Sequence, residues 1–176
     1  MKQHGLTNFR TFYLMLCIVF YASILRGQTQ YTGPANGDWF TVANWTNGLP
    51  AVGNNATIPG GASVVINAPL STAFKIESFG GLTNNSTLTI SDTLFSGGLF
   101  TNTGTITANA SARITSSGGF SNSGTLNNAG IITSNSLFTN SATGILTNDG
   151  TISQLANFTN DGLVNNKTGV LLLLKS

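Results

Sequence analysis

Apolar and polar residues alternate with a period of two along the second half of the chain. In the stretch FTNTGTIT, at 100–107, one set of alternate positions holds Phe100, Asn102, Gly104 and Ile106, and the other holds only threonines. Short alternating runs rich in Thr and Ile, separated by Gly and Asn-Asp-Gly, predict strands and turns. The chain shows no apolar stripe with the 3.6-residue period of a helix, and no proline occurs after Pro69. We therefore expect an all-β protein.

The alternating runs belong to a repeat. Each unit opens with Leu or Phe, continues with Ser or Thr, and has Asn in third place. The openings are spaced by 18, 20, 18 and 20 residues, at Leu82, Phe100, Phe120, Phe138 and Phe158. The third positions are Asn84, Asn102, Asn122, Asn140 and Asn160. A fixed period of this length predicts a stack of similar supersecondary units.

Two further aliphatic positions follow the same period. One lies six residues before each Phe, at Leu94, Ile114, Ile132 and Ile152. The other lies six residues after the unit opening, at Leu88, Ile106, Leu126 and Val164, with Ile145 one residue late in the fourth unit. Three positions in register predict about five coils of 18–20 residues in a parallel β-solenoid, because parallel stacking at about 4.8 Å places identical residues over one another. An antiparallel meander gives identical residues no reason to align.

The repeated Asn shares the parity of the inward Phe. Its amide both donates and accepts hydrogen bonds, and Asn is well suited to turns. We therefore expect the five Asn side chains to form an inward ladder along the stack. The simpler interpretation is that each is an ordinary surface turn residue.

Residues 28–81 precede the repeats, which we assign to 82–176, and differ from them in amino-acid composition. They hold all four prolines and both tryptophans, Trp39 and Trp45, with strands expected near Ala56–Ile58 and Ser63–Ile66. The first coil of a solenoid exposes an unpaired edge that needs covering. We interpret 28–81 as an N-terminal cap with both indoles in the core; stacking of the indoles on sugar rings is the alternative.

The cap also carries a resemblance. Its matching residues are Gly37, Trp39, Asn44, Trp45, Gly48, Pro50 and 56–61. The pattern resembles the N-terminal start of bacterial secreted β-helix proteins, including autotransporter-like and Bacteroidetes-type surface proteins. The resemblance implies an exported, right-handed parallel β-helix, often adhesive. The chain departs from those families in being short and in having no recognisable sorting or barrel module after the repeats.

Residues 1–27 have the layout of a signal peptide. Lys2 and Arg10 precede the apolar run 12–25, which is too short to span a bilayer unaided. After cleavage we expect no stable membrane span and a secreted or cell-surface protein.

The expected mature chain is nearly neutral. From Gln28 onward it has four basic residues (Lys75, Arg113, Lys167, Lys175) and five acidic ones (Asp38, Glu77, Asp92, Asp149, Asp161), a net charge of −1. We therefore expect no nucleic-acid partner.

The expected mature chain is poor in catalytic groups. Cleavage removes Cys17 and His4, the only cysteine and the only histidine, and with them serine-triad chemistry and the usual zinc sites. Asp149 and Asp161 precede glycines and are interpreted as turn formers. We predict no catalytic residues, no metal site, no cofactor and no enzyme activity.

The outward face offers the candidate binding residues. Thr87, Thr105, Thr125 and Thr143 are expected in one register, and 83, 101, 121, 139 and 159 in another. Such hydroxyl rows suit a surface glycan or protein, although Thr also simply favours strands. We predict a structural or adhesive module; a carbohydrate-binding or polysaccharide-cleaving β-helix is the alternative.

The chain ends in an apolar run, Val170–Leu174. Folded over the last coil, the run would plug the core. Extended as a strand, it would leave alternate leucines and an unpaired edge in water. We expect self-association through this C-terminal edge.

Overall fold

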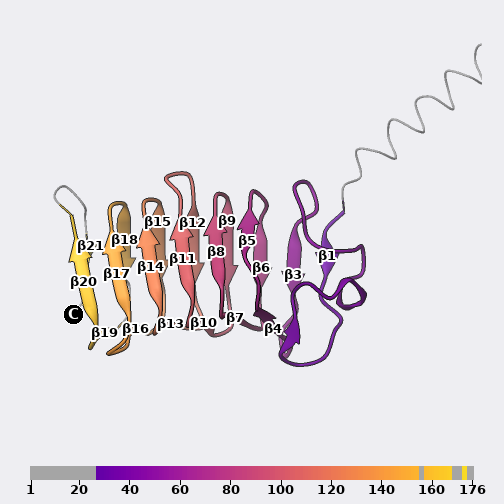
Figure 1. Ribbon diagram of the computed structural model, residues 1–176, viewed down its shortest axis with the longest axis horizontal. Helices are drawn as coiled ribbons and strands as arrows, with labels where there is room; N and C mark the ends of the chain where they lie inside the picture. The colour runs from indigo at the N-terminus through magenta and orange to yellow at the C-terminus, as the bar shows by residue number, and fades with distance from the viewer. Residues whose placement is uncertain (1–26, 155–156, 168–171, 174–176) are drawn as a thin grey trace, which may run out of the picture.

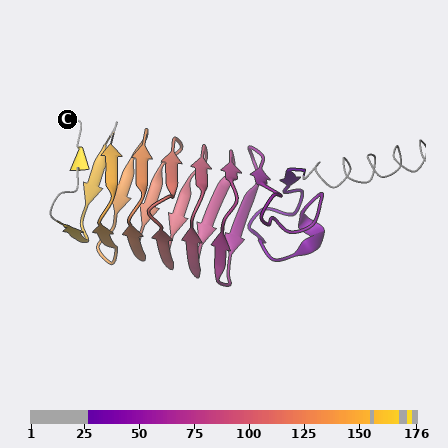
Figure 2. The same cartoon turned by 90° about the horizontal axis from the view of Figure 1, so that it is seen from above.

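The chain forms a parallel β-solenoid. The computed structural model describes residues 27–154, 157–167 and 172–173, so the expected signal peptide lies, apart from Gly27, outside the described residues. About six coils of about 19 residues stack in chain order along the long axis of the molecule (Figures 1 and 2). The predicted all-β solenoid is confirmed, with about six coils instead of five.

Three parallel sheets form the walls of the coil, and each coil contributes one strand to each wall. In spatial order the eight-stranded sheet contains β1 (Thr29–Gln30), β3 (Ala56–Ile58), β6 (Ile76–Ser78), β9 (Thr93–Ser96), β12 (Arg113–Ser116), β15 (Ile131–Ser134), β18 (Thr151–Gln154) and β21 (Leu172–Leu173). The seven-stranded sheet contains β19 (Phe158–Asn160), β16 (Phe138–Asn140), β13 (Phe120–Asn122), β10 (Phe100–Asn102), β7 (Gly81–Asn84), β4 (Ser63–Ile66) and β2 (Gly37–Asp38). The six-stranded sheet contains β20 (Leu163–Asn166), β17 (Ile145–Asn148), β14 (Thr125–Asn128), β11 (Thr105–Ala108), β8 (Thr87–Ile90) and β5 (Leu70–Thr72).

The core consists of columns of like side chains. Phe100, Phe120 and Phe138 are register partners, and their rings stack with centroids 4.8 Å apart and planes within 10° of parallel. Each aromatic pair contributes about 0.5–1.5 kcal/mol beyond the area that it buries. Columns of aliphatic residues line the other two sheets, at Ile76, Leu94, Ile114, Ile132 and Ile152 in one and at Leu70, Leu88, Ile106, Leu126 and Leu146 in the other.

The alternating 18- and 20-residue spacings come from turns of different length. Between β11 and β12 four residues separate Ala108 from Arg113, whereas two separate Ile90 from Thr93 in the coil before. The registers Ala108↔Ile90 and Arg113↔Thr93 are nevertheless preserved. Extra residues therefore enlarge one corner and leave the columns in place.

The parallel sheets continue into residues 28–81. β3 and β4 occupy the two predicted strand positions and pair in parallel with β6 and β7. Before them, Tyr31, Trp39 and Trp45 pack edge to face and are at most 4% exposed. The Trp45 Nε1 donates to the Trp39 carbonyl oxygen at 2.8 Å. Because both indoles are buried, neither presents a face for stacking on a sugar.

Tyr31 anchors this aromatic cluster through its hydroxyl. The hydroxyl donates to the Pro34 carbonyl oxygen at 2.8 Å. A Cβ added at Gly37 would lie 2.0 Å from that hydroxyl, so Gly37 provides the space for it. Burial raises the pKa of the Tyr31 hydroxyl above its usual value, and the nearby Asp38 carboxylate acts in the same direction.

Close stacking of the turns predicts that one class of glycine cannot carry a side chain. A Cβ added at Gly124 would lie 2.0 Å from the Gly104 carbonyl oxygen of the coil below, whereas one added at Gly60 would meet no atom within 4 Å. We expect Gly124→Ala to lower the free energy of unfolding by about 1–3 kcal/mol, as overpacking does. Gly60→Ala, the control, should change it by less than about 0.5 kcal/mol. Urea denaturation measures both, and equal losses would contradict the steric argument.

Candidate functional site

The repeated asparagines form a hydrogen-bonded ladder inside one corner of the coil. In each step the Nδ2 of one residue donates to the Oδ1 of its register partner. The four distances are 2.8, 2.7, 2.7 and 2.8 Å, from Asn84 through Asn102, Asn122 and Asn140 to Asn160. The first four side chains are completely buried, and Asn160, in the last coil, is exposed.

The same amides also hold the turns. The Nδ2 of Asn102 donates to the Gly104 carbonyl oxygen of its own turn at 3.2 Å and to the Thr125 carbonyl oxygen of the next coil at 3.0 Å. Asn122 repeats this arrangement with Gly124 and Ile145. A buried turn carbonyl without a partner costs about 1–3 kcal/mol, so each amide removes penalties in two coils at once.

Sequence reasoning missed a second ladder, at the corner after the six-stranded sheet. There the Nδ2 of Asn128 donates to the Oδ1 of Asn148, which donates in turn to Asn166, both at 2.8 Å. The signal was present, because these residues are spaced by 20 and 18 like the first ladder. The third corner has a column of buried serines, in which Ser78, Ser96 and Ser134 each donate to a carbonyl two residues ahead.

The candidate hydroxyl face lies on the outside of the six-stranded sheet. Thr87, Thr105 and Thr125 are register partners in β8, β11 and β14, with Thr87 exposed and the other two half-buried. A second outward column lies two residues further along each strand. It consists of Ser71, Thr89, Thr107, Asn127, Thr147 and Asn165. Polar groups therefore repeat at about 4.8 Å across the strands and about 6.7 Å along them.

The prediction that Thr143 continues the first column is wrong. The partner of Thr125 is Ile145, and Thr143 lies in the preceding turn, where its Oγ1 donates to the Ser123 carbonyl oxygen. The turn after Asn140 is two residues longer than that after Asn122, which moves the following strand along the sequence by two. For the same reason Leu146, not Ile145, continues the inward aliphatic column. The hydroxyl column thus gives way to the exposed Ile145 and Leu163.

The seven-stranded sheet presents a narrower hydroxyl column. Its members are register partners of one another: Thr83, Thr101, Ser121, Thr139 and Thr159. Most strands of this sheet have three residues, with Phe and Asn inward and one hydroxyl outward. This face therefore has one row of hydroxyls where the six-stranded sheet has two rows of polar groups.

Two residue types common in catalytic and metal sites are missing from the described part of the chain. It contains neither histidine nor cysteine, and no three of its acidic side chains are grouped so as to hold a metal ion. Among the same residues, no helix has the length and apolarity needed to cross a membrane. The outer faces of the six- and seven-stranded sheets offer hydrogen bonding from ordered rows of hydroxyl and amide groups.

The ladder predicts different losses at two asparagines. Asn122→Ala removes the acceptor of Asn102, the donor to Asn140 and two bonds to turn carbonyls. Asn109 is half-buried and makes one side-chain bond, to Ser91 Oγ at 2.7 Å. We expect Asn122→Ala to cost about 1–3 kcal/mol for each buried group left unsatisfied, and Asn109→Ala about 1 kcal/mol. Thermal and urea denaturation of both variants measures these losses in the free energy of unfolding. Equal small losses would show that Asn122 acts as an ordinary turn residue.

Comparisons with known proteins do not identify the chain. No protein-family model, no curated protein and no solved structure matches it significantly. Of what the resemblance in residues 37–61 implies, the structure shows the parallel β-solenoid, and no comparison shows membership of an adhesin or autotransporter family. Any function must be argued from the geometry of this molecule.

Proposed function

We propose that this protein is an exported, non-catalytic β-solenoid that serves as a structural or adhesive module at the cell surface or in the extracellular space. The observation that carries the proposal is the ordered double row of polar groups outside the six-stranded sheet. A rigid wall with evenly spaced hydroxyls suits multivalent contact with a repetitive surface such as a glycan, because many weak bonds form without ordering loops.

The distribution of polar groups inside the coil supports a structural role. The buried amides and most of the buried serine hydroxyls bond to neighbouring coils or to their own turns. These groups therefore stabilise the stack of coils.

The layout of residues 1–27 supports export, and N-terminal sequencing of the protein recovered outside the cell tests it. A chain retained inside the cell with its first 27 residues would refute that part.

The adhesive role predicts that hydroxyl removal on one face weakens binding. We expect the 28–176 chain to bind a glycan array or cell surface without cleaving it, and Thr105→Val/Thr125→Val to reduce retention at least tenfold. The matched control, Thr101→Val/Thr139→Val, removes two hydroxyls from the seven-stranded sheet and should leave retention unchanged. Equal effects of the two variants would contradict a role for this face. Turnover in a screen of uronate polymers would favour the polysaccharide-cleaving alternative.

We further infer that the C-terminal coil pairs with a second copy of the chain. In the described residues β19 and β20 each have one strand neighbour. Phe158 and Val164 are only partly covered, whereas their equivalents in earlier coils are buried. At the N-terminal end, by contrast, the aromatic residues Tyr31, Trp39 and Trp45 are at most 4% exposed. Of the apolar run expected here, Leu172 and Leu173 form β21, whose backbone continues the eight-stranded sheet beside β18, and Val170, Leu171 and Leu174 lie outside the described residues.

Side-chain parity restricts the register of this pairing. When two β20 strands pair in antiparallel fashion, inward residues face inward residues only if one residue lies directly opposite its own copy across the two-fold axis. Of the registers that meet this condition, we choose the one centred on Val164. It sets Asp161, which precedes β20, opposite Lys167 of the other copy, which follows β20. Both side chains are exposed, and Lys167 already pairs with Asp149 at 2.7 Å.

A charge exchange tests the pairing. We expect the 28–176 chain to form dimers in light scattering, and Asp161→Lys to shift it toward monomer because like charges then meet. Adding Lys167→Asp to that variant should restore the dimer. A monomer at high protein concentration for the unaltered chain would overturn the inference, as would a double variant no better than the single one.

A further inference from the structure

The outer face of the eight-stranded sheet differs chemically from the other two. Eight charged side chains occur in the described residues, and four of them lie at β6, β9 and β12: Lys75, Glu77, Asp92 and Arg113. Two exposed or half-exposed aromatic residues, Phe79 and Phe95, lie among them. Of the described strands in the other two sheets, only β2 contains a charged residue, Asp38, and none contains an outward aromatic residue, so the clustering marks a separate surface.

The two phenyl rings form an apolar patch. Phe79 follows β6 directly and is 52% exposed, and Phe95 is an outward residue of β9. Their centroids are 5.6 Å apart with the planes inclined by 57°. A Cβ added at Gly97 would lie 3.3 Å from a ring carbon of Phe95, a tight contact, and 3.6 Å from one of Phe79, an ordinary contact, so the glycine gives room to the Phe95 ring.

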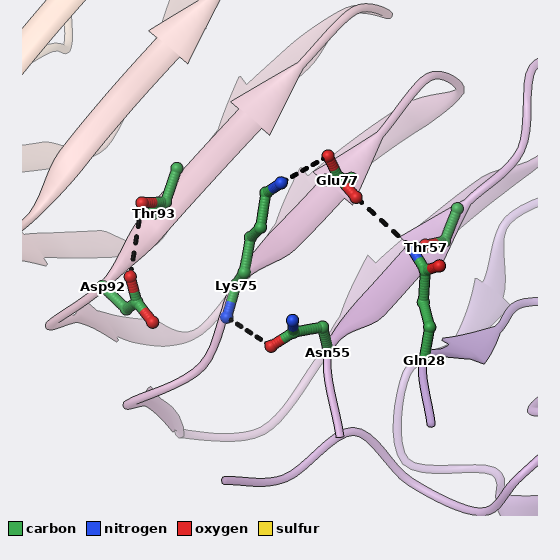
Figure 3. A network of polar contacts seen from close by, with 7 residues as sticks. All are labelled: Gln28, Asn55, Thr57, Lys75, Glu77, Asp92 and Thr93. Atoms are coloured by element: carbon green, nitrogen blue, oxygen red, sulfur yellow. Dashed lines mark hydrogen bonds and ion pairs between the residues drawn. The ribbon is translucent and has the colours of Figure 1, made fainter. Parts of the chain in front are cut away.

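Fixed polar groups lie directly beside the rings. Glu77 is the register partner of Phe95, and both point outward. The Glu77 carboxylate pairs with Lys75 Nζ at 2.6 Å and accepts from Gln28 Nε2 at 3.2 Å (Figure 3). Gln28 also donates to the Thr57 hydroxyl. Directly before β9, Asp92 accepts from the Thr93 hydroxyl at 3.2 Å. These contacts hold the carboxylates in place before any ligand arrives, which lowers the entropy lost on binding.

We propose that this surface, defined by Phe79, Phe95, Lys75, Glu77, Asp92 and Arg113, binds a neutral polysaccharide. A pyranose ring has an apolar C–H face that packs on an aromatic ring and a rim of hydroxyls that bonds to carboxylate, ammonium and guanidinium groups. Aromatic residues beside preplaced hydrogen-bonding groups match both parts of a sugar. The proposal rests on the adhesive function above and deepens it by naming the ligand class and a second face.

Charge and backbone pairing on this face separate a neutral glycan from two other partners. The two cations and two carboxylates balance, so a polyanion gains little net attraction. β6, β9 and β12 are interior strands with parallel partners on both sides. A peptide therefore has no free strand edge to extend here. A partner protein docking on the apolar patch alone would not need Glu77.

Substitution of the aromatic and acidic residues tests the site. The probes are soluble glucan, mannan and xylan, with polygalacturonate as the charged comparison, in affinity electrophoresis of the 28–176 chain. We expect at least one neutral polymer to retard the protein equally at 0.1 and 0.5 M NaCl. Phe79→Ala, Phe95→Ala and Glu77→Gln should each weaken the retardation at least fivefold. Leu137→Ala, which truncates an exposed leucine beside the seven-stranded sheet, is the matched control and should have no effect.

The outcomes distinguish this site from the general function. Melting temperatures close to that of the unaltered chain show that each variant is folded, and Glu77→Gln gives a readout that removes no apolar packing. Retention on a glycan or cell surface that is lost in Thr105→Val/Thr125→Val but kept in the three variants would overturn this site and leave the adhesive function standing. Failure of the unaltered chain to bind any surface or polymer would overturn both. Binding restricted to polygalacturonate, falling steeply with salt, would overturn the neutral-glycan assignment.

Discussion

Parallel stacking of coils at the interstrand spacing is the constraint on which the rest of this structure depends. Each strand hydrogen-bonds to the strands above and below it, so every side chain lies about 4.8 Å from its counterpart in the next coil. The Phe rings at 4.8 Å and the amide ladders at 2.7–2.8 Å both satisfy that spacing. A residue that stacks well on itself is therefore favoured, and the repeat in the sequence is its consequence.

The corners decide which polar residues are compatible with this stacking. A narrow coil turns three times, and each turn places backbone carbonyls where water is excluded. Asn at two corners and Ser at the third supply the missing donors from within the core. Glycine follows at several corners because the turns pack closely: a Cβ added at Gly124 would lie 2.0 Å from the Gly104 carbonyl oxygen. A purely apolar corner would leave these carbonyls without partners, at about 1–3 kcal/mol each.

The outer faces are free of that constraint, and there the three walls diverge. The six-stranded sheet has two rows of mainly hydroxyl and amide groups, the seven-stranded sheet has one row of hydroxyls, and the eight-stranded sheet gathers aromatic and charged residues at β6, β9 and β12. Since stability is supplied by the inward columns, an outward position can change with little loss, usually within about 0.5 kcal/mol. The faces are thus where binding properties can be set independently of the fold.

Period and parity in the sequence were sufficient to determine the solenoid, the inward Phe column, the strands at Ala56–Ile58 and Ser63–Ile66, and the membership of the first Asn column. They were sufficient because like residues must recur wherever parallel strands stack. Period and parity do not determine turn length. The two extra residues after Asn140 move Thr143 out of its expected column, and only the pairing between coils shows that Ile145 lies beside Thr125. The proximity of Phe79, Phe95 and Glu77 was also decided by tertiary structure. Residues 16–18 apart become neighbours through the winding of the chain, and no local pattern in the sequence records that contact.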